Sequence, residues 1–372
     1  MKKKVVILFP GSAHRPIGGH KVVYEYANRF VADGYEVDMV YPAFKYRYGK
    51  FQLGEFLWRF SYATLNYIIR YLFHLYSCRK WFPLDKRIRE HWVYSLRKNH
   101  IPNADIYIAT AIKTSVYLNS YKDVPNGSKL YFIQGYECWG DVSKTELHKT
   151  YHFPFRKIAV SHWLKKVIED TGESCTLIRN GFDFNYFSLA HPIETRSKFM
   201  ICMGFSASPN KGSFDAIEAL NIVKEKYPQL EINVFSAEHC PKFLPNWFHY
   251  YRIPDQETHN RILNDSAIFI APSWSEGFGL TVGEAMICGC AVVCADNPGH
   301  QEMAIHGKTA LLSPIKDSKA LASNIIQLIE NDSLRYQIAN NGHQFIQNFT
   351  WNDSYLQFKQ LVDATSNDLH YV

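Results

Sequence analysis

The sequence of 372 residues contains no long uncharged apolar run. Its best candidate for a membrane span, residues 57–78, carries Arg59 and Arg70, and Arg70 lies well inside the segment. A charge near the centre of a bilayer costs at least about 2.5 kcal/mol, so a membrane-crossing helix is not expected. The apolar run after Lys4 is too short for a signal peptide and ends at Pro10, and it predicts a buried first strand instead.

Metal-binding spacing is also missing from the eight cysteines. Cys288, Cys290 and Cys294 come closest to a cluster, but the last two flank a predicted buried strand. Free, buried thiols are the better interpretation, and they are typical of a reducing cytoplasm. Short repeats and low-complexity tracts are absent as well.

Acidic residues are scarce in one stretch only, residues 43–100. This stretch holds 12 of the 41 Lys and Arg but only three of the 35 Asp and Glu. Aromatic residues are interleaved with the cations at partly helical spacing, which favours surface helices on an anionic membrane. The alternative is ordinary core packing with a solvated charged face. Nucleic acid is disfavoured as a partner, because the pattern resembles long helices rather than a recognised nucleic-acid module.

Alternating strands and helices dominate both halves of the chain. Hydrophobic residues make up 47% and charged residues 20% of a chain long enough for two domains. Strands are expected over residues 5–9, 36–41, 106–109, 129–133, 157–160, 176–179, 199–203, 231–235, 248–252, 267–270, 291–294 and 310–312. The helices between them predict an α/β protein with two doubly wound domains. The aperiodic segment 186–196, which contains Pro192, is interpreted as the linker.

Two carboxylates, Glu276 and Glu284, flank a glycine-rich loop between a predicted strand and a predicted helix. Such loops lie at the C-terminal edge of a parallel sheet, where open α/β folds bind ligands. A carboxylate accepts paired hydroxyl hydrogen bonds, so a sugar or ribose is a natural partner. The amides of Leu280 and Thr281 would face a phosphate. Alternatively, Glu284 only stabilises its own helix N-terminus and Glu276 is a solvated loop residue.

Two further junctions between a loop and a helix are candidates for phosphate binding. Lys211 precedes a predicted helix, where its charge would neutralise a diphosphate. Taken alone, this residue fits an ordinary surface lysine better. Gly18 and Gly19 open a helix after the first strand and would let the backbone approach a phosphate. A flexible turn is the alternative for this pair.

Several stretches, in order along the chain, resemble the retaining nucleotide-sugar glycosyltransferases of family 4, the glycosyl transferases group 1. They are Gly18-Gly19-His20, Val160-Ser161, Arg179-Asn180-Gly181-Phe182-Asp183, Lys211-Gly212, Glu276-x7-Glu284 and Pro298-Gly299-His300-Gln301-Glu302. The resemblance implies the GT-B fold, with two Rossmann-like doubly wound domains facing a central cleft. It divides the chain into an acceptor-binding domain, 1–190, a nucleotide-sugar-binding domain, 197–350, and a C-terminal helix, 351–372, that crosses back to the first domain.

The resemblance also implies roles for the matching residues. Glu276 is expected to contact donor-sugar hydroxyls, and Glu284 the nucleotide ribose. Lys211 would hold the diphosphate together with the start of the next helix, at Gly279, Leu280 and Thr281. Gly18 and Gly19 would approach the phosphates, and the base would lie against residues 251–254. Arg179 and Asn180 belong to the expected substrate-binding set.

The mechanism implied by the resemblance is front-face hexosyl transfer with retention. The leaving diphosphate helps to deprotonate the acceptor hydroxyl, and Glu276 and Lys211 are the expected catalytic residues. No metal or other cofactor is required, because Lys211 and helix N-termini can supply the positive potential. UDP, GDP and dTDP donors all suit the motifs.

Two departures from the family pattern concern the phosphate and the acceptor. Many members carry an Arg where this chain has Phe205-Ser206, and Arg179 or Arg15 could substitute. Many members also place a His near the acceptor, where the candidates here are Gln134, Tyr136 and Glu137. Glu137 could serve as a polar or basic group, or it could be a plain structural carboxylate.

Together these features predict a glycosyltransferase of surface-polysaccharide or cell-envelope synthesis. A glycan acceptor held by a lipid, at the inner face of the cytoplasmic membrane, would explain the basic aromatic stretch. A nucleotide-sugar epimerase on the same fold would need acid/base residues and no acceptor site, and a phosphorylase would need a pyridoxal-phosphate lysine and a longer chain. A non-catalytic membrane scaffold that binds nucleotide sugars is the remaining alternative, against which Glu276, Glu284 and Lys211 argue.

Overall fold

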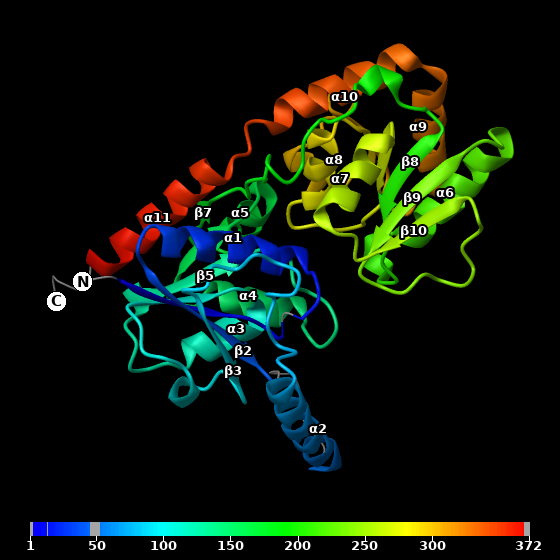
Figure 1. Ribbon diagram of the computed structural model, residues 1–372. Helices are drawn as coiled ribbons and strands as arrows, with labels where there is room; N and C mark the ends of the chain where they lie inside the picture. Colours follow the sequence, from blue (N-terminus) through cyan, green and yellow to red (C-terminus); the bar gives the residue numbers. More distant parts are fainter. Residues whose placement is uncertain (1–2, 13, 45–52, 368–372) are drawn as a thin grey trace. The chain divides into compact units, whose positions relative to one another are not determined.

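A computed structural model describes residues 3–12, 14–44 and 53–367, which form two compact units (Figure 1). Unit 1 comprises the chain up to Arg179 together with the segment from Asn352 onward, and unit 2 comprises Asn180–Trp351. The chain thus passes from unit 1 to unit 2 between Arg179 and Asn180. This passage precedes the segment 186–196 that the sequence suggested as a linker. That segment packs on unit 2, because the buried Arg196 donates to the backbone oxygens of His191, Ser266 and Cys288.

Unit 1 is built on a seven-stranded parallel sheet in the order β3-β2-β1-β4-β5-β6-β7. Its strands are β1 (Lys4–Leu8), β2 (Glu36–Pro42), β3 (Arg89–Val93), β4 (Ile106–Ala109), β5 (Lys129–Ile133), β6 (Arg156–Ala159) and β7 (Thr176–Leu177). Its helices are α1 (Gly18–Ala32), α2 (Leu53–Leu72), α3 (Ile112–Asn119), α4 (Lys144–Tyr151), α5 (His162–Glu169) and α11 (Trp351–Asn367), whose first residue is assigned to unit 2.

Unit 2 repeats the same plan on a six-stranded parallel sheet in the order β10-β9-β8-β11-β12-β13. Its strands are β8 (Met200–Gly204), β9 (Glu231–Ser236), β10 (Phe248–Arg252), β11 (Ile268–Ala271), β12 (Ala291–Ala295) and β13 (Ala310–Ser313). Its helices are α6 (Ser213–Lys226), α7 (Gln256–Asp265), α8 (Leu280–Ile287), α9 (Ser318–Glu330) and α10 (Asp332–Ile346). Both sheets therefore have doubly wound order, and the strand order reverses between β1 and β4 and between β8 and β11.

Fully buried apolar strands form the core of each unit. Val292 and Val293 of β12 are inaccessible, as are Val5 and Val6 of β1, as expected for parallel strands covered on both faces. All eight cysteines are free, and six of them are buried as expected, whereas Cys138 is half-buried and Cys240 is exposed. Burial raises the pKa of the Cys290 thiol to about 12, so this thiol is protonated and unreactive at neutral pH.

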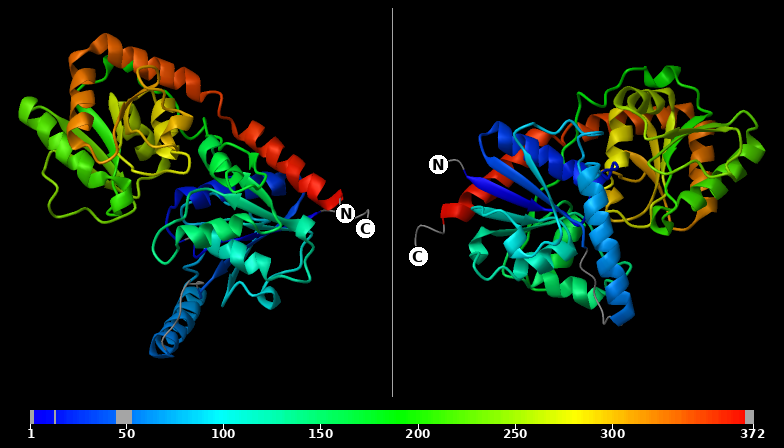
Figure 2. Two further views of the ribbon diagram at one scale, coloured as in Figure 1. Left: turned by 180° about the vertical axis from the view of Figure 1, so that it is seen from behind. Right: turned by 60° about the horizontal axis from the view of Figure 1, so that its bottom comes forward.

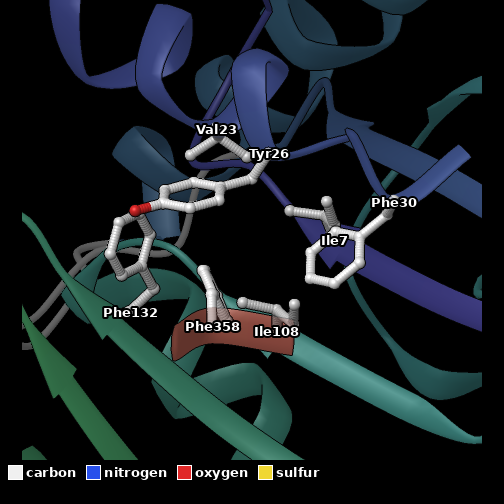
Figure 3. A pocket seen from close by; sticks show the side chains of 7 residues that line it. All are labelled: Ile7, Val23, Tyr26, Phe30, Ile108, Phe132 and Phe358. Atoms are coloured by element: carbon white, nitrogen blue, oxygen red, sulfur yellow. The ribbon is translucent and has the colours of Figure 1, made fainter. Parts of the chain in front are cut away.

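Helix α11 packs on unit 1 through aromatic side chains, hydrogen bonds and ion pairs. Phe358 lies against Tyr26 and Phe132, with ring centroids 4.7 and 5.3 Å away, and closes a small apolar cavity (Figure 3). At the surface, the Asp33 carboxylate accepts hydrogen bonds from the Tyr355 hydroxyl at 2.7 Å and the Lys359 ammonium at 2.6 Å. The C-terminal helix is therefore part of unit 1 in structure, although it is last in sequence.

The basic aromatic stretch forms one long helix and an edge strand rather than a series of helices. Helix α2 projects from unit 1 (Figures 1 and 2), whereas β3 pairs with β2. Arg89 and His91 alternate along β3 and both bind the buried Asp38 of β2, at 2.8 and 2.5 Å, which fixes this segment as a strand. Residues 45–52 of the stretch lie outside the described residues.

Candidate functional site

The reversal of strand order in unit 2 brings two loops together, one after β8 and one after β11. The Lys211 ammonium lies 2.7 Å from Oε1 of Glu276. The loops are locked by Gly212, which has φ +62°, and a Cβ there would lie 2.2 Å from the backbone oxygen of Pro272. The amide of Trp274 also donates to the backbone oxygen of Asn210 at 2.9 Å. The Lys-Gly motif therefore places a cation beside the first carboxylate of the Glu-x7-Glu motif.

Glu276 is held in its ionised form by its neighbours. Its side chain is 20% exposed, and burial alone would raise its pKa. Lys211, and to a smaller extent His300, outweigh that effect and lower the pKa of Glu276 below its usual value. A carboxylate that is ionised at neutral pH suits hydrogen bonds from sugar hydroxyls better than a proton-transfer role.

A third loop, after β12, packs directly under the Glu276 loop. A Cβ on Gly299 would lie 2.2 Å from the backbone oxygen of Glu276, and a Cβ on Gly279 would lie 2.9 Å from Cδ2 of His300. Asn297 holds this third loop, because its Oδ1 accepts the amides of Gly299 and His300 at 3.0 and 3.1 Å. In the sequence, His300 stands out only as part of the Pro-Gly-His motif, which assigns it no role.

Helix α8 begins directly after this contact. It carries Glu284, the second carboxylate of the Glu-x7-Glu motif. Gly279, with φ +87°, is its N-cap residue, and the first amides of the helix, those of Leu280 and Thr281, have no intrahelical acceptor. Glu284 lies on α8 and is only 9% exposed. Burial, followed by the charge of Glu284, raises the pKa of Tyr186 to about 12, so the two side chains share one environment. Glu276 and Glu284 thus have different neighbours.

After β8, many family members carry an Arg where this chain has Phe205-Ser206, and here the loop binds the carboxylate of Glu238. The Ser206 hydroxyl donates to Oε1 of Glu238 at 2.8 Å, and the Ala207 amide donates to Oε2 at 3.0 Å. Among the described residues of this loop, Lys211 therefore carries the cationic charge alone. Arg15 and Arg179, the two suggested substitutes, both belong to unit 1.

Other predicted site residues lie elsewhere. Arg179 is exposed and its backbone oxygen accepts the Ser354 hydroxyl at 2.6 Å, whereas Asn180 is 3% exposed and starts unit 2. They mark the crossing between the units.

In unit 1, Gly18 and Gly19 begin α1, and its N-cap residue Ile17 has no side chain that could cap the helix. The Gln134 side chain lies against Gly19, where a Cβ would be 3.5 Å from Oε1 of the glutamine. That oxygen is buried and has no hydrogen-bond partner among the described residues. Gln134 follows β5, so it comes to the same edge of the sheet as the start of α1.

Glu137 has a structural contact in unit 1. Its Oε2 accepts the Ile112 amide at 2.9 Å, at the start of α3. Burial raises the pKa of Glu137 to about 7, although the Ile112 amide and Lys113 act in the opposite direction. The carboxylate caps α3, which agrees with the structural interpretation offered by the sequence.

Helix α2 and the residue that follows it expose large apolar side chains, which we call the α2 stripe: Trp58, Tyr62, Leu65, Ile68, Ile69, Tyr71, Leu72 and Phe73. Two nearby cations are bound within unit 1. Arg70 donates to Ser12, Asn66 and the backbone of Leu75, and Arg79 pairs with Glu90 at 2.7 Å. In the described part of the chain, no helix is both long and apolar enough to cross a membrane.

A model of the family Glycosyl transferases group 1 matches residues 189–345. A phosphatidyl-myo-inositol mannosyltransferase of Mycobacterium tuberculosis is 24% identical over 210 residues, which are 52% of this chain and 56% of the relative. An N,N'-diacetylbacillosaminyl-diphospho-undecaprenol alpha-1,3-N-acetylgalactosaminyltransferase of Campylobacter jejuni is 36% identical over 83 residues, 22% of each chain. The chain thus spans about half the length of the mannosyltransferase.

Solved structures resemble the whole chain. Sucrose-phosphate synthase from Thermosynechococcus elongatus matches with a TM-score of 0.70 and 15% identity over 98% of this chain and 99% of the other. Anabaena HepE, solved in complex with UDP and glucose, matches with a TM-score of 0.70 and 17% identity. This match covers 97% of this chain and 100% of HepE. These likenesses confirm the GT-B fold expected from the sequence motifs.

Proposed function

The chain belongs to the glycosyl transferases group 1 family, and we propose that it is a retaining glycosyltransferase. It moves a hexosyl group from a nucleotide-diphosphate donor to a hydroxyl of a glycan acceptor. The observation that carries this proposal is the contact between Lys211 and Glu276 at the strand-order reversal of unit 2, beside the uncapped start of α8. A cation, an ionised carboxylate and free amides together match a diphosphate joined to a sugar.

Each group has a separate task in this proposal. Glu276 accepts hydrogen bonds from the donor-sugar hydroxyls, and Glu284, on the buried side of α8, binds the ribose. Lys211 and the amides of Leu280 and Thr281, which follow Gly279, hold the diphosphate. In unit 1, the start of α1 at Gly18-Gly19 offers further amides to an anion.

Transfer with retention needs little acid/base chemistry from the protein. The bond from the anomeric carbon to the donor phosphate breaks, and the bond to the acceptor oxygen forms on the same face. The acceptor proton goes to the departing diphosphate. Lys211 exchanges Glu276 for the phosphate, because its own side chain is 47% exposed and can turn toward a ligand, whereas that of Glu276 is 20% exposed. The freed carboxylate is then available to the sugar.

Replacement of Glu276 by Gln tests the assignment. Glu276→Gln should abolish transfer while it leaves nucleotide binding nearly intact, because the amide is isosteric but uncharged. Binding is measured by calorimetry with UDP, GDP and dTDP and their sugars, and transfer by release of the nucleoside diphosphate. Full activity of the variant would refute the role of Glu276. Sugar conversion without an acceptor would identify an epimerase, and binding without turnover in the wild type would identify a scaffold.

The acceptor is proposed to be lipid-linked and to lie at the inner face of the cytoplasmic membrane, in surface-glycan synthesis. The α2 stripe supports this proposal, because an exposed patch of this kind marks an interaction site. The basic excess of residues 43–100 would add attraction to anionic lipids. The names of the two relatives also describe lipid acceptors, phosphatidyl-myo-inositol and diphospho-undecaprenol.

Co-sedimentation with vesicles tests the membrane proposal. The triple variant Trp58→Ala, Leu65→Ala and Leu72→Ala should lose sedimentation with phosphatidylglycerol vesicles, because it removes apolar area from the α2 stripe. Leu356→Ala on α11 is the matched control, since Leu356 is 46% exposed outside the stripe. Equal sedimentation of the triple variant and the control would refute the proposal.

A further inference from the structure

His300 is a buried histidine whose two ring nitrogens have different surroundings. The residue is 1% exposed. Its Nδ1 lies 2.9 Å from the backbone oxygen of Ala295, and a carbonyl oxygen can only accept, so Nδ1 carries the proton. The side-chain nitrogen of Asn297 also lies 2.9 Å from Nδ1, and it donates one of its two hydrogens to the backbone oxygen of Ser273 at 2.7 Å. The neutral ring therefore has its lone pair on Nε2.

Nε2 has no hydrogen-bond partner among the described residues, unlike Nδ1. It is bonded to Cδ2, the atom that approaches Gly279 at the start of α8. The charges of Glu276 and Lys211 both act on this ring. The second nitrogen thus lies beside the residues assigned to the sugar and the phosphate, but the fold itself makes no use of it.

We propose that Nε2 of His300 accepts a hydrogen bond from a hydroxyl of the donor sugar and so helps to determine which sugar is transferred. The inference rests on the proposed function and extends its sugar end from one residue to two. Glu276 would accept from hydroxyls as a charged group, and His300 as a neutral one. A site that pairs a buried polar group with a hydroxyl discriminates strongly against sugars that lack it, since the group is then left unpaired.

This role needs a neutral ring, and the surroundings provide it. Burial lowers the pKa of His300, and Lys211 acts in the same direction, while Glu276 and Asp296 oppose them. Acidification protonates Nε2 and removes its lone pair, so the hydroxyl loses its acceptor. The affinity for the nucleotide sugar should therefore fall relative to that for the nucleoside diphosphate as the pH decreases through the pKa of His300.

Two substitutions of His300 test the roles of Nδ1 and Nε2 independently. The amide of His300→Asn can replace Nδ1–H toward Ala295 but places nothing at Nε2, whereas the longer His300→Gln places a polar group near Nε2. Calorimetry compares UDP-glucose with UDP and GDP-mannose with GDP. With the pair that the wild type binds, His300→Asn should weaken the nucleotide sugar about tenfold, the usual effect of one lost hydrogen bond. Affinity for the diphosphate should stay within roughly twofold, and His300→Gln should recover part of the loss.

The outcomes distinguish this inference from the proposed function. If the wild type binds no nucleotide sugar, both are wrong. If it binds one and His300→Asn leaves the ratio of the two affinities unchanged, only the role of His300 is wrong. Equal weakening of both ligands would show that His300 is merely structural. The ratio of affinities between pH 5 and 8 in the wild type is an independent measurement that needs no variant, and a pH-independent ratio would overturn the inference.

Discussion

The two units share one strand order but differ in how they employ the polar groups at its reversal. In unit 2, the loops after β8 and β11 bring Lys211 to 2.7 Å from Glu276. In unit 1, the corresponding edge holds Glu137, whose carboxylate accepts the Ile112 amide and thereby caps a helix. The same topology thus offers a ligand site twice, and in unit 2 the charges remain available to a ligand.

The largest expected difference between the units is in stability, when one glycine of each unit is replaced by alanine. Gly212→Ala should strongly destabilise unit 2, by roughly 3 kcal/mol, because φ is +62° and the new Cβ would lie 2.2 Å from the Pro272 oxygen. Gly19→Ala in unit 1 should be nearly neutral for stability, since its Cβ would meet nothing closer than 3.5 Å. Thermal unfolding followed by calorimetry measures both variants. Equal destabilisation would contradict the view that tight glycine contacts shape the unit 2 site alone.

The second-largest expected effect is on nucleotide binding, and it compares two ion pairs with equal N–O distances. Lys211 pairs with Glu276 at 2.7 Å in unit 2, and Lys113 pairs with Asp141 at 2.7 Å in unit 1. Lys211→Ala should weaken nucleoside-diphosphate binding about tenfold or more, because a charge-assisted hydrogen bond contributes roughly 1.5–3 kcal/mol. Lys113→Ala should change it less than about twofold. Calorimetric titration with UDP or GDP is the measurement, and similar losses in both variants would remove Lys211 from the phosphate site.

Much of this site could be predicted from the sequence, because buried parallel strands are continuous apolar runs and the loops after them contain glycine. The alternation of strands and helices predicted the fold class. Lys211 precedes α6, Glu276 follows β11 and Glu284 lies on α8, as the sequence predicted. β3 was missed, because its register depends on pairing with the buried Asp38, a contact between distant segments.

The remaining differences also arise from packing that sequence spacing does not encode. The aperiodic segment 186–196 looks like a linker until the buried Arg196 is seen to bind three backbone oxygens around it. His300 could be found as a polar residue after a buried strand, in a Pro-Gly-His motif. Which of its nitrogens the fold uses depends on the position of the Ala295 oxygen, and this position is visible only in three dimensions.

The pH dependence of stability should have opposite signs at the two carboxylates. The pKa of Glu137 is raised to about 7 by burial, so the folded state holds a proton that the unfolded state, with a pKa near 4.3, has lost. Stability due to Glu137 therefore falls as pH rises from about 4.3 to about 7. The pKa of Glu276 is lowered, mainly by Lys211 against the effect of burial, so its contribution is present above the unfolded pKa and is lost on acidification.

Glu137→Gln tests this difference, because the amide oxygen can still accept the Ile112 amide but does not titrate. The variant should unfold at a higher temperature than the wild type at pH 8, and the gap should close toward pH 5. Glu276→Gln should show no such gain at pH 8. A gain of Glu137→Gln that is constant with pH would refute the raised pKa of Glu137 as its cause.

The smallest expected effect on the whole protein concerns the attachment of α2 to unit 1. Arg70 joins α2 to the loop before α1 through Ser12 at 2.8 Å, and it also binds Asn66 at 2.6 Å and the Leu75 oxygen at 2.9 Å. Arg70→Ala should speed hydrogen exchange in α2 and leave unit 2 unchanged, because every one of these partners lies in unit 1.

Arg87→Ala is the matched control, since the side chain of Arg87 binds only Asp85 among the described residues. If α2 exchanges equally fast in both variants, the helix is held by Trp92, which donates to the Tyr67 oxygen at 3.0 Å, rather than by Arg70. A loosened α2 that still carries its apolar stripe should continue to bind vesicles, so this variant separates attachment of the helix to unit 1 from its contact with a membrane.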